Sequence, residues 1–297
     1  LSRRSGDEDR PRILDAFNEP TTHWLSFFMF AMFTDRDGKY QLAALAESGF
    51  DPLARTCRFM LTEEAHHMFV GETGISRILE RTCQLMKESK GLAEDVRRQG
   101  GIDLEMIQRH LNFWFSRSLD LHGSEVSSNA ASYFANGLKG RAREETYEDH
   151  HITDAVFDME VYEDGRLFQH EVPMRNAMNE VLRDWYVGDC LAGVERWNKI
   201  LEHYGLSDRL YLPDKKFSRG IGIFSGFYFD PKGNSVSLEE WERRRGDWLP
   251  VKADKDYLKS IMVEPIYEPG VFANYIAPPR RGINRMPLDF KYVRTEA

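Results

Sequence analysis

The sequence predicts a mainly α-helical protein, with a helical bundle followed by a mixed, loop-rich C-terminal region that contains a β-hairpin. Before residue 140, long segments repeat apolar residues at helical spacing. After Gly205 the pattern changes to aromatic and small residues that alternate around turn-forming residues. We therefore expect a polar connector over residues 1–20, a bundle portion over 21–140, and a helical and loop-rich region over 141–297.

Composition limits the class of protein. A chain of 297 residues with 41% hydrophobic and 30% charged residues is typical of a soluble globular protein. Its net charge of −8 argues against nucleic acid as the main partner. The longest apolar run, residues 24–33, is about half of what a bilayer requires, so no membrane partner is expected. The cysteines Cys57, Cys83 and Cys190 form no disulfide framework and fit a reducing cytoplasm.

The first predicted helix begins near Thr21 and places Asp35 on its apolar stripe. We expect Gly38 to bend or interrupt this helix and Gly49 to end it. Asp51-Pro52 is a helix-start signal, and the second helix is predicted to run to about Lys87, with less support after Gly71 and Gly74. Further helices are predicted over residues 104–118, 119–135 and 172–204.

The C-terminal region contains different signals. Residues 222–237 predict a hairpin that turns at Asp230-Pro231-Lys232-Gly233. The sequence SLEE at 237–240 is a capping box that opens a short helix. Residues 264–297 are rich in proline and glycine, and we expect them to form an extended tail.

The stretch EEAHH at 63–67 places two Glu-x-x-His pairs on the second helix. In each pair a carboxylate and an imidazole lie one turn apart, a geometry that suits one iron or manganese ion. Glu64 and His67 fall on the predicted buried stripe, whereas Glu63 and His66 share a more polar side. The residues that define this stripe are Cys57, Met60, Leu61, Met68, Gly71, Ile75, Ile78 and Leu79. Because a charged glutamate on a buried stripe is costly unless it is paired or metal-bound, the pair Glu64/His67 is the candidate.

Asp35 is a second carboxylate on an apolar stripe, one helix upstream. A carboxylate from one helix and Glu-x-x-His from its neighbour make up half of a di-iron carboxylate site, so the predicted metal ligands are Asp35, Glu64 and His67. No catalytic residue is predicted beyond them. The spacing recurs in Glu148 and His151, which lie in a strongly charged stretch and are interpreted as solvated. A solvated Glu–His pair and an ordinary turn at Asp35 are the competing interpretations.

Long segments of the chain are recognisable. The stretch LSFFMFAMFTDRDGKYQLAALAESGFDPLARTCRFMLTEEAHHMFVGETG resembles the oxygenase components of benzoyl-CoA 2,3-epoxidase, a ferritin-like di-iron family of aerobic benzoate degradation. The stretches SNAASYFANGLKGR, AGVERWNKI, GIFSGFYFDPKG and FANYIAPPRRGIN are similar to the same family, so the resemblance covers essentially the whole chain.

The resemblance implies a ferritin-like bundle that holds two iron ions. It also implies O2 and benzoyl-CoA as substrates, and a separate NADPH-dependent flavin/iron–sulfur reductase as electron donor. Asp35, Glu64 and His67 match the second ligand set of the family. The first set belongs to helices upstream of Leu1, and the chain has no initiator methionine. We therefore expect an N-terminally truncated piece that is incomplete as an enzyme by itself.

The sequence indicates the substrate-binding residues less clearly than the metal ligands. Aromatic and methionine side chains near Asp35 could line a ring pocket, although such stripes are more often core: Phe27, Phe28, Phe30, Met32 and Phe33. GIGIFSG at 220–226 is not a dinucleotide fingerprint, so no nucleotide cofactor is assigned to this chain. The alternatives are a di-iron oxygenase for another aromatic acyl-CoA or aromatic acid, and a non-catalytic metal-containing helical protein.

Overall fold

The computed structural model describes residues 15–89, 92–140, 155–163, 165–262, 271–281, 285 and 290–293. The predicted mainly helical class is confirmed. The α-helices are α1 (Trp24–Ala46), α2 (Asp51–Glu88), α3 (Ala93–Arg98), α4 (Leu104–Leu119), α5 (Ser128–Ala135), α6 (Met178–His203), α7 (Leu238–Trp248) and α8 (Lys252–Ser260). The strands are β1 (Val156–Glu163), β2 (Arg166–Pro173), β3 (Val271–Ala273) and β4 (Lys291–Val293). Short 3-10 helices are η1 (Asp15–Phe17), η2 (Asp120–His122) and η4 (Met174–Asn176).

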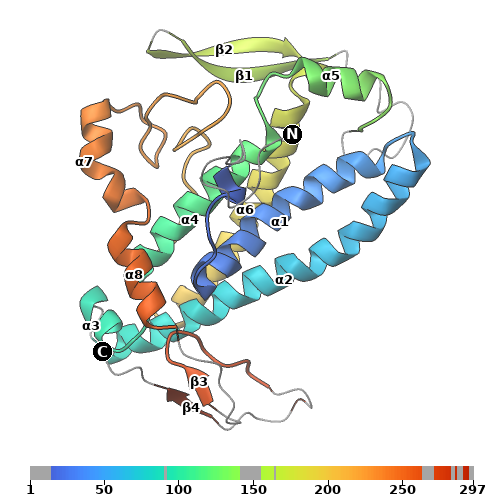
Figure 1. The fold of residues 1–297 in the computed structure, drawn as a ribbon. Coiled ribbons are helices and arrows are strands. Elements are labelled where there is room, and N and C mark those ends of the chain that lie inside the picture. Colours follow the sequence, from blue (N-terminus) through green and yellow to red (C-terminus); the bar gives the residue numbers. More distant parts are fainter. Residues whose placement is uncertain are drawn as a thin grey trace.

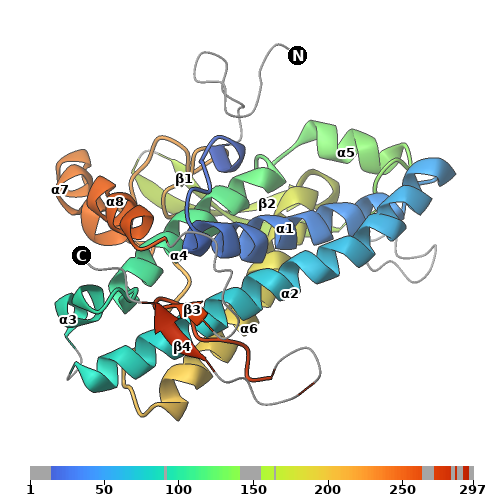
Figure 2. The ribbon, with the colours of Figure 1, turned by 60° about the horizontal axis from the view of Figure 1, so that its bottom comes forward.

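The centre of the fold is an antiparallel pair of long helices, α1 and α2, against which α4 and α6 pack (Figures 1 and 2). Residues 47–50 connect α1 to α2, and such a short connection forces neighbouring helices to run antiparallel. His23 caps α1 by accepting a hydrogen bond from the Ser26 backbone, and Pro52 lies in the first turn of α2. The first helix therefore meets the second along most of its length.

The core lies where α1, α2, α4 and α6 converge. Each helix contributes apolar side chains that are almost completely buried. They include Leu25, Met29, Met32 and Phe33 from α1, Ile75, Ile78 and Leu79 from α2, Ile107, Leu111, Trp114 and Phe115 from α4, and Tyr186, Val194 and Trp197 from α6. Because α6 begins after residue 177, the packed helices come from two separated parts of the sequence.

Glycines allow α1 and α2 to approach closely. A Cβ atom on Gly71 would overlap the Met32 backbone nitrogen, and one on Gly74 would overlap the Phe28 ring. These glycines do not weaken the second half of α2, which is continuous to Glu88. Gly38 does not interrupt the first helix as one of the two expectations had it, because α1 continues through it to Ala46. Tertiary packing outweighs the low helix propensity of glycine at these positions.

The first half of α2 is much more exposed than the second half. The predicted buried stripe is confirmed at Cys57, Gly71 and Ile75, but it is wrong at Met60, which is 42% exposed. Phe59 and Phe69 are even more exposed. The described helices therefore cover only one side of α2 before Gly71.

Two predicted elements differ in the structure. The segment 119–135 is divided, because η2 ends at His122 and is followed by Gly123, which has a φ of +85°, before α5 begins. The predicted hairpin at 222–237 is a turn with a single bridge, between Phe229 and Ser235. Positive φ angles at Gly222 and Gly226 prevent an extended strand before that turn.

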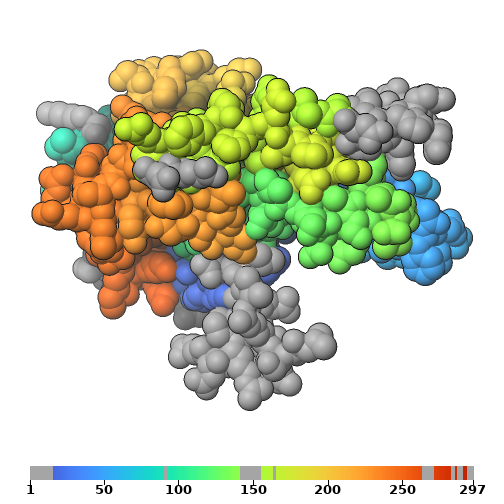
Figure 3. Space-filling view, turned by 90° about the horizontal axis from the view of Figure 1, so that it is seen from above, coloured from blue at the N-terminus to red at the C-terminus, as the bar shows by residue number. Residues whose placement is uncertain are grey.

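The regular hairpin lies elsewhere, in the antiparallel pair β1–β2. In the space-filling view the yellow-green residues of this hairpin lie against the green α5 segment and the orange segment that follows α6 (Figure 3). The helix predicted from residue 172 accordingly starts later, at Met178. Ser237 caps α7 as predicted, with its side chain accepting a hydrogen bond from the Glu240 backbone.

Buried ion pairs tie the segment after α6 to the bundle. Arg219 donates to Asp120 at 2.7 Å and pairs with Glu125 at 3.0 Å, and both carboxylates are nearly inaccessible to solvent. Asp120 also accepts the backbone N–H of Gly220, and Glu125 accepts that of Ile223. The backbone here bonds to side chains of the bundle, which explains why it does not pair as a strand.

The C-terminal part of the chain lies along the second half of α2 (Figure 2). Ala277 exchanges two hydrogen bonds with Arg77, and Arg81 donates to the backbone oxygen of Asn274. The pair β3–β4 is short and parallel. Most of the predicted extended tail, residues 264–297, lies outside the described residues.

Candidate metal site

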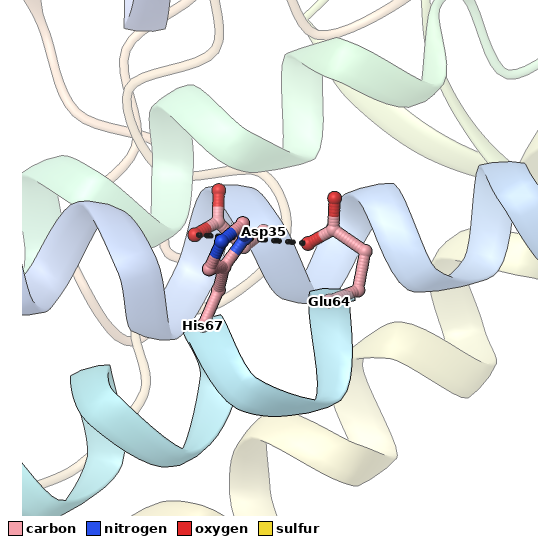
Figure 4. Close-up of side chains that lie close together, drawn as sticks. All are labelled: Asp35, Glu64 and His67. Atoms are coloured by element: carbon pink, nitrogen blue, oxygen red, sulfur yellow. Dashed lines mark ion pairs between the residues drawn. The ribbon is translucent and has the colours of Figure 1, made fainter. Parts of the chain in front are cut away.

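Three potential metal ligands meet halfway along the α1–α2 pair. Asp35 points from α1 toward α2, which supplies Glu64 and His67 one turn apart (Figure 4). The Nδ1 atom of His67 lies 3.8 Å from Asp35 Oδ2 and 3.7 Å from Glu64 Oε2. One ligand atom from each residue lies within 4.8 Å of the other two. These separations exceed hydrogen-bond lengths, so the side chains surround a common point without bonding directly to one another.

The structure places the two Glu-x-x-His pairs differently. Glu64 is 17% exposed and lies close to Asp35, whereas Glu63 and His66 face solvent and join no such group. Gly38 of α1 lies opposite the Glu64 carboxylate. A Cβ atom at position 38 would be in ordinary van der Waals contact with that carboxylate. The expectation that His67 lies on a buried stripe is wrong, because its side chain is 49% exposed where no described helix covers it, so the site is open to solvent on the imidazole side.

The two carboxylates lie in an environment that disfavours two negative charges. Burial and the nearby charge of Glu64 raise the pKa of Asp35 to about 7, opposed only by His67. Burial also raises the pKa of Glu64, and the charge of Asp37 acts in the same direction. A cation between Asp35 and Glu64 would reverse both effects by favouring their charged forms.

Nearby basic side chains do not supply that cation. Arg36 pairs with Glu72 at 3.1 Å and with Asp189 at 2.8 Å. Lys39 pairs with Asp189 at 2.7 Å. Among the described residues, no lysine or arginine forms an ion pair with Asp35 or Glu64. No basic side chain in the described part of the protein therefore neutralises the carboxylates of Asp35 and Glu64.

The donor set fits a divalent transition metal ion. Two carboxylates and one imidazole are ligands typical of iron and manganese. Oxygen Oε2 of Glu64 is buried and has no hydrogen-bond partner among the described residues, which is costly unless a cation contacts it. The described part of the chain contains no second group of this kind. Glu148 and His151, the other predicted candidates, lie outside the described residues.

The aromatic stripe near Asp35 is mainly core. Phe28, Met32 and Phe33 are buried, and Phe30 packs against the core. Phe27 is 39% exposed and lines a pocket at the start of α1. These side chains therefore belong to the core and do not line a ring pocket, with the exception of Phe27.

A buried carboxylate–imidazole contact close to the site was not anticipated. Asp37 Oδ1 lies 2.9 Å from His122 Nδ1, and both side chains are almost completely buried. His122 belongs to η2, and no spacing in the sequence links it to α1. Only the packing of η2 against α1 and α6 brings the pair together.

Fold and site together define a mainly helical protein in which two antiparallel helices hold a carboxylate–imidazole cluster suited to a metal ion. No protein-family profile matches the chain. The chain is 53% identical over 300 residues to benzoyl-CoA oxygenase component B of Aromatoleum evansii, which confirms the resemblance seen in the sequence. The alignment covers 99% of this chain and 62% of that relative, so the chain spans less than two thirds of the relative's length. None of the described helices is long and apolar enough to cross a membrane.

Proposed function

We propose that this chain belongs to an oxygenase component for benzoyl-CoA and contributes one half of a di-iron centre. The observation that supports this proposal is the group Asp35, Glu64 and His67, which is held between antiparallel helices. The chain that contains this group resembles such a component over 99% of its own residues. In ferritin-like di-iron proteins each half-site consists of a carboxylate and a Glu-x-x-His pair. The remaining ligands would lie upstream of Leu1, as the resemblance implies.

Each residue of the group has a distinct role in this proposal. Asp35 and Glu64 would supply negative charge, and their carboxylates can bind through one oxygen or two. His67 would bind through one ring nitrogen from the solvent-exposed side. When bound, two iron ions would allow O2 to deliver one oxygen atom to the aromatic ring as an epoxide, with the other released as water. A separate NADPH-dependent flavin/iron–sulfur reductase would supply the electrons.

The ligand assignment can be tested by loading the protein anaerobically with ferrous iron. Iron per polypeptide is measured for this chain and for the same chain extended upstream. In the extended chain, Glu64→Gln and His67→Asn are expected to lower iron affinity more than about tenfold, because each removes a ligand. Glu63→Gln and His66→Asn change the same residue types on the solvent side and are expected to retain iron.

A second readout separates a ligand from a residue needed for folding. Glu64→Gln removes a buried, like-charged carboxylate, so the metal-free variant is expected to melt at a higher temperature than the metal-free parent. Equal iron affinity in the Glu63→Gln and Glu64→Gln proteins would refute the assignment. With reductant and O2, product analysis on benzoyl-CoA, free benzoate and other aromatic acyl-CoA esters then tests the substrate.

A further inference from the structure

A row of five charged side chains joins α1, α2 and α6 beside the candidate metal site. Its members alternate in sign and are, in order, Lys39, Asp189, Arg36, Glu72 and Arg196. The successive distances between nitrogen and oxygen are 2.7, 2.8, 3.1 and 2.5 Å. This row, called the charged clamp below, connects the antiparallel pair to a helix from a distant part of the sequence.

Three helices meet at Glu72 of α2. Arg36 of α1 donates to its Oε2 atom, and Arg196 of α6 donates to both of its carboxylate oxygens. Trp197 of α6 donates to the Glu72 backbone oxygen at 3.2 Å. A Cβ atom on Gly193 would lie 3.8 Å from Oε2, so the backbone of α6 also comes close to this carboxylate. Because the bond with Arg196 is bidentate, it fixes the orientation of the Glu72 carboxylate as well as its position.

Arg36 connects α1 to both neighbouring helices. Its side chain is 5% exposed and folds back along α1, where Nε donates to the Met32 backbone oxygen at 3.3 Å. Its Nη1 atom contacts the carboxylate and the backbone oxygen of Asp189 on α6. Lys39 and Tyr40, also from α1, donate to the same carboxylate. These contacts hold α1 against rotation and sliding relative to α6.

The charged clamp lies next to the candidate ligands on both helices. Arg36 directly follows Asp35, and Glu72 follows His67 by five residues, or about 7.5 Å along the axis of α2. Successive residues of a helix are about 100° apart, so Asp35 and Arg36 point in different directions. In the described part of the chain, no hydrogen bond or ion pair joins the clamp to Asp35, Glu64 or His67. The clamp therefore acts on the ligands through the helices that carry them.

We infer that the charged clamp sets the register of α1 against α2, and that Arg36 and Glu72 are positioning residues for the metal ligands. This inference rests on the proposed function. Asp35 lies on one helix, and Glu64 and His67 lie on the other, so any slide of α1 along α2 separates them. A metal site needs its donors held within about 0.5 Å of the productive geometry. Close packing sets the distance between two helices, whereas directional ion pairs also set how they slide and rotate.

The inference is tested by titrating the chain extended upstream with Co²⁺, which stands in for ferrous iron. Glu72→Gln and Arg36→Met are each expected to weaken Co²⁺ binding at least about fivefold, because each releases α1 from α2. These two substitutions remove opposite charges. An effect of charge alone would weaken binding in Glu72→Gln but strengthen it in Arg36→Met. The visible absorption of bound Co²⁺ depends on the arrangement of its donors, and its intensity is expected to change in both variants.

Further variants separate positioning from a general loss of stability. Arg196 is 49% exposed, so Arg196→Met is expected to fold and to weaken Co²⁺ binding about twofold, where charge alone predicts tighter binding. Arg36→Lys keeps the charge and is expected to recover part of the affinity that Arg36→Met loses. Arg109→Met removes a bidentate pair with Asp254, between α4 and α8, and is the matched control. It should lower Tm without a change in Co²⁺ affinity.

The outcomes separate this inference from the proposed function. Unchanged Co²⁺ affinity in both Glu72→Gln and Arg36→Met would overturn the inference and leave the proposed function intact. Tighter binding in Arg36→Met or Arg196→Met would assign the effect to charge and overturn the inference as well. An equal loss of affinity in Arg109→Met would trace the effect to general destabilisation, with the same consequence. If the extended parent bound no Co²⁺, the proposed function itself would be overturned, and this inference with it.

Discussion

At the scale of single residues, burial decides which ionisable groups deviate from ordinary behaviour. Asp35 and Glu64 are partly buried beside one another, so both hold protons more tightly than free carboxyl groups. His23 and His110 are buried with their rings edge to face, 5.3 Å apart, and burial lowers both pKa values. The carboxyl pair has an arrangement that a cation would stabilise, whereas the histidine pair is arranged to stay neutral.

The histidine pair predicts acid sensitivity. Burial lowers the pKa of His110 from 6.5 to about 4, so between these values the unfolded chain binds more protons than the folded one. The contribution of His110 to the free energy of unfolding should therefore be complete above pH 6.5 and fall by about 3 kcal/mol as pH drops through 4. Asp35, whose pKa is raised, contributes in the opposite sense over the same range. Urea denaturation at a series of pH values measures this slope.

Replacing the ring tests the origin of that slope. His110→Phe has no titrating nitrogen at this position, so the difference in free energy of unfolding between parent and variant should change by about 3 kcal/mol between pH 6.5 and 4, in favour of the variant at low pH. His170→Phe, on an exposed strand, is the matched control and should show no such change. An equally steep slope in the His110→Phe protein would assign the acid sensitivity to other groups.

At the scale of elements, the contact between α1 and α2 depends on two glycines. Gly71 lies against the Met32 backbone, one turn from His67. The same contact sets the spacing of the helices at Asp35. Any side chain at position 71 would therefore push the two halves of the candidate site apart.

Gly71→Ala is accordingly expected to destabilise the protein by about 1–3 kcal/mol through overpacking, and to weaken iron binding. Gly188→Ala, on α6, is the matched control. No atom lies within 4 Å of a Cβ there, so alanine should stabilise by about 0.5–1 kcal/mol through helix propensity. Thermal unfolding should show a lower Tm for Gly71→Ala and a higher Tm for Gly188→Ala than for the parent. An unchanged Tm in Gly71→Ala would contradict the close contact between the helices.

The long helices and the grouping of Asp35, Glu64 and His67 could be predicted from the sequence because apolar residues that recur at helical spacing mark the side of a helix that faces its neighbours. The exposure of Met60 could not, since an apolar residue on a stripe looks the same whether or not a neighbour covers it. The hairpin β1–β2 was missed although Asp164-Gly165 is a strong turn signal between alternating residues. The buried pair Asp37–His122 has no local signal, because it joins two segments through packing alone.

At the scale of the whole molecule, the bundle and the segment after α6 are joined by buried charge. Asp120 and Glu125 follow α4, Arg183 lies on α6, and Arg219 comes from the segment itself. All four side chains are at most 3% exposed. Such a group adds little net stability compared with apolar packing, but removal of one member leaves uncompensated charges inside.

Arg219→Met should therefore lower the free energy of unfolding by about 3–5 kcal/mol, because Asp120 and Glu125 lose their shared partner. Arg245→Met removes the exposed pair with Glu242 on α7 and should cost less than about 1 kcal/mol. Urea denaturation of both variants provides the comparison. If both variants lost a similarly small free energy of unfolding, the buried charges would not depend on Arg219 for their compensation.

The short connection between α1 and α2 also has an entropic effect on ion binding. Fixing the backbone of one residue costs about 1–2 kcal/mol, and residues 47–50 are ordered when the helices fold. Glu64 and His67 already share one rigid helix, and Asp35 is held opposite them. A metal ion arriving at this group would restrict only side-chain rotations, so most of the chain entropy needed to gather its donors is lost during folding instead of at binding.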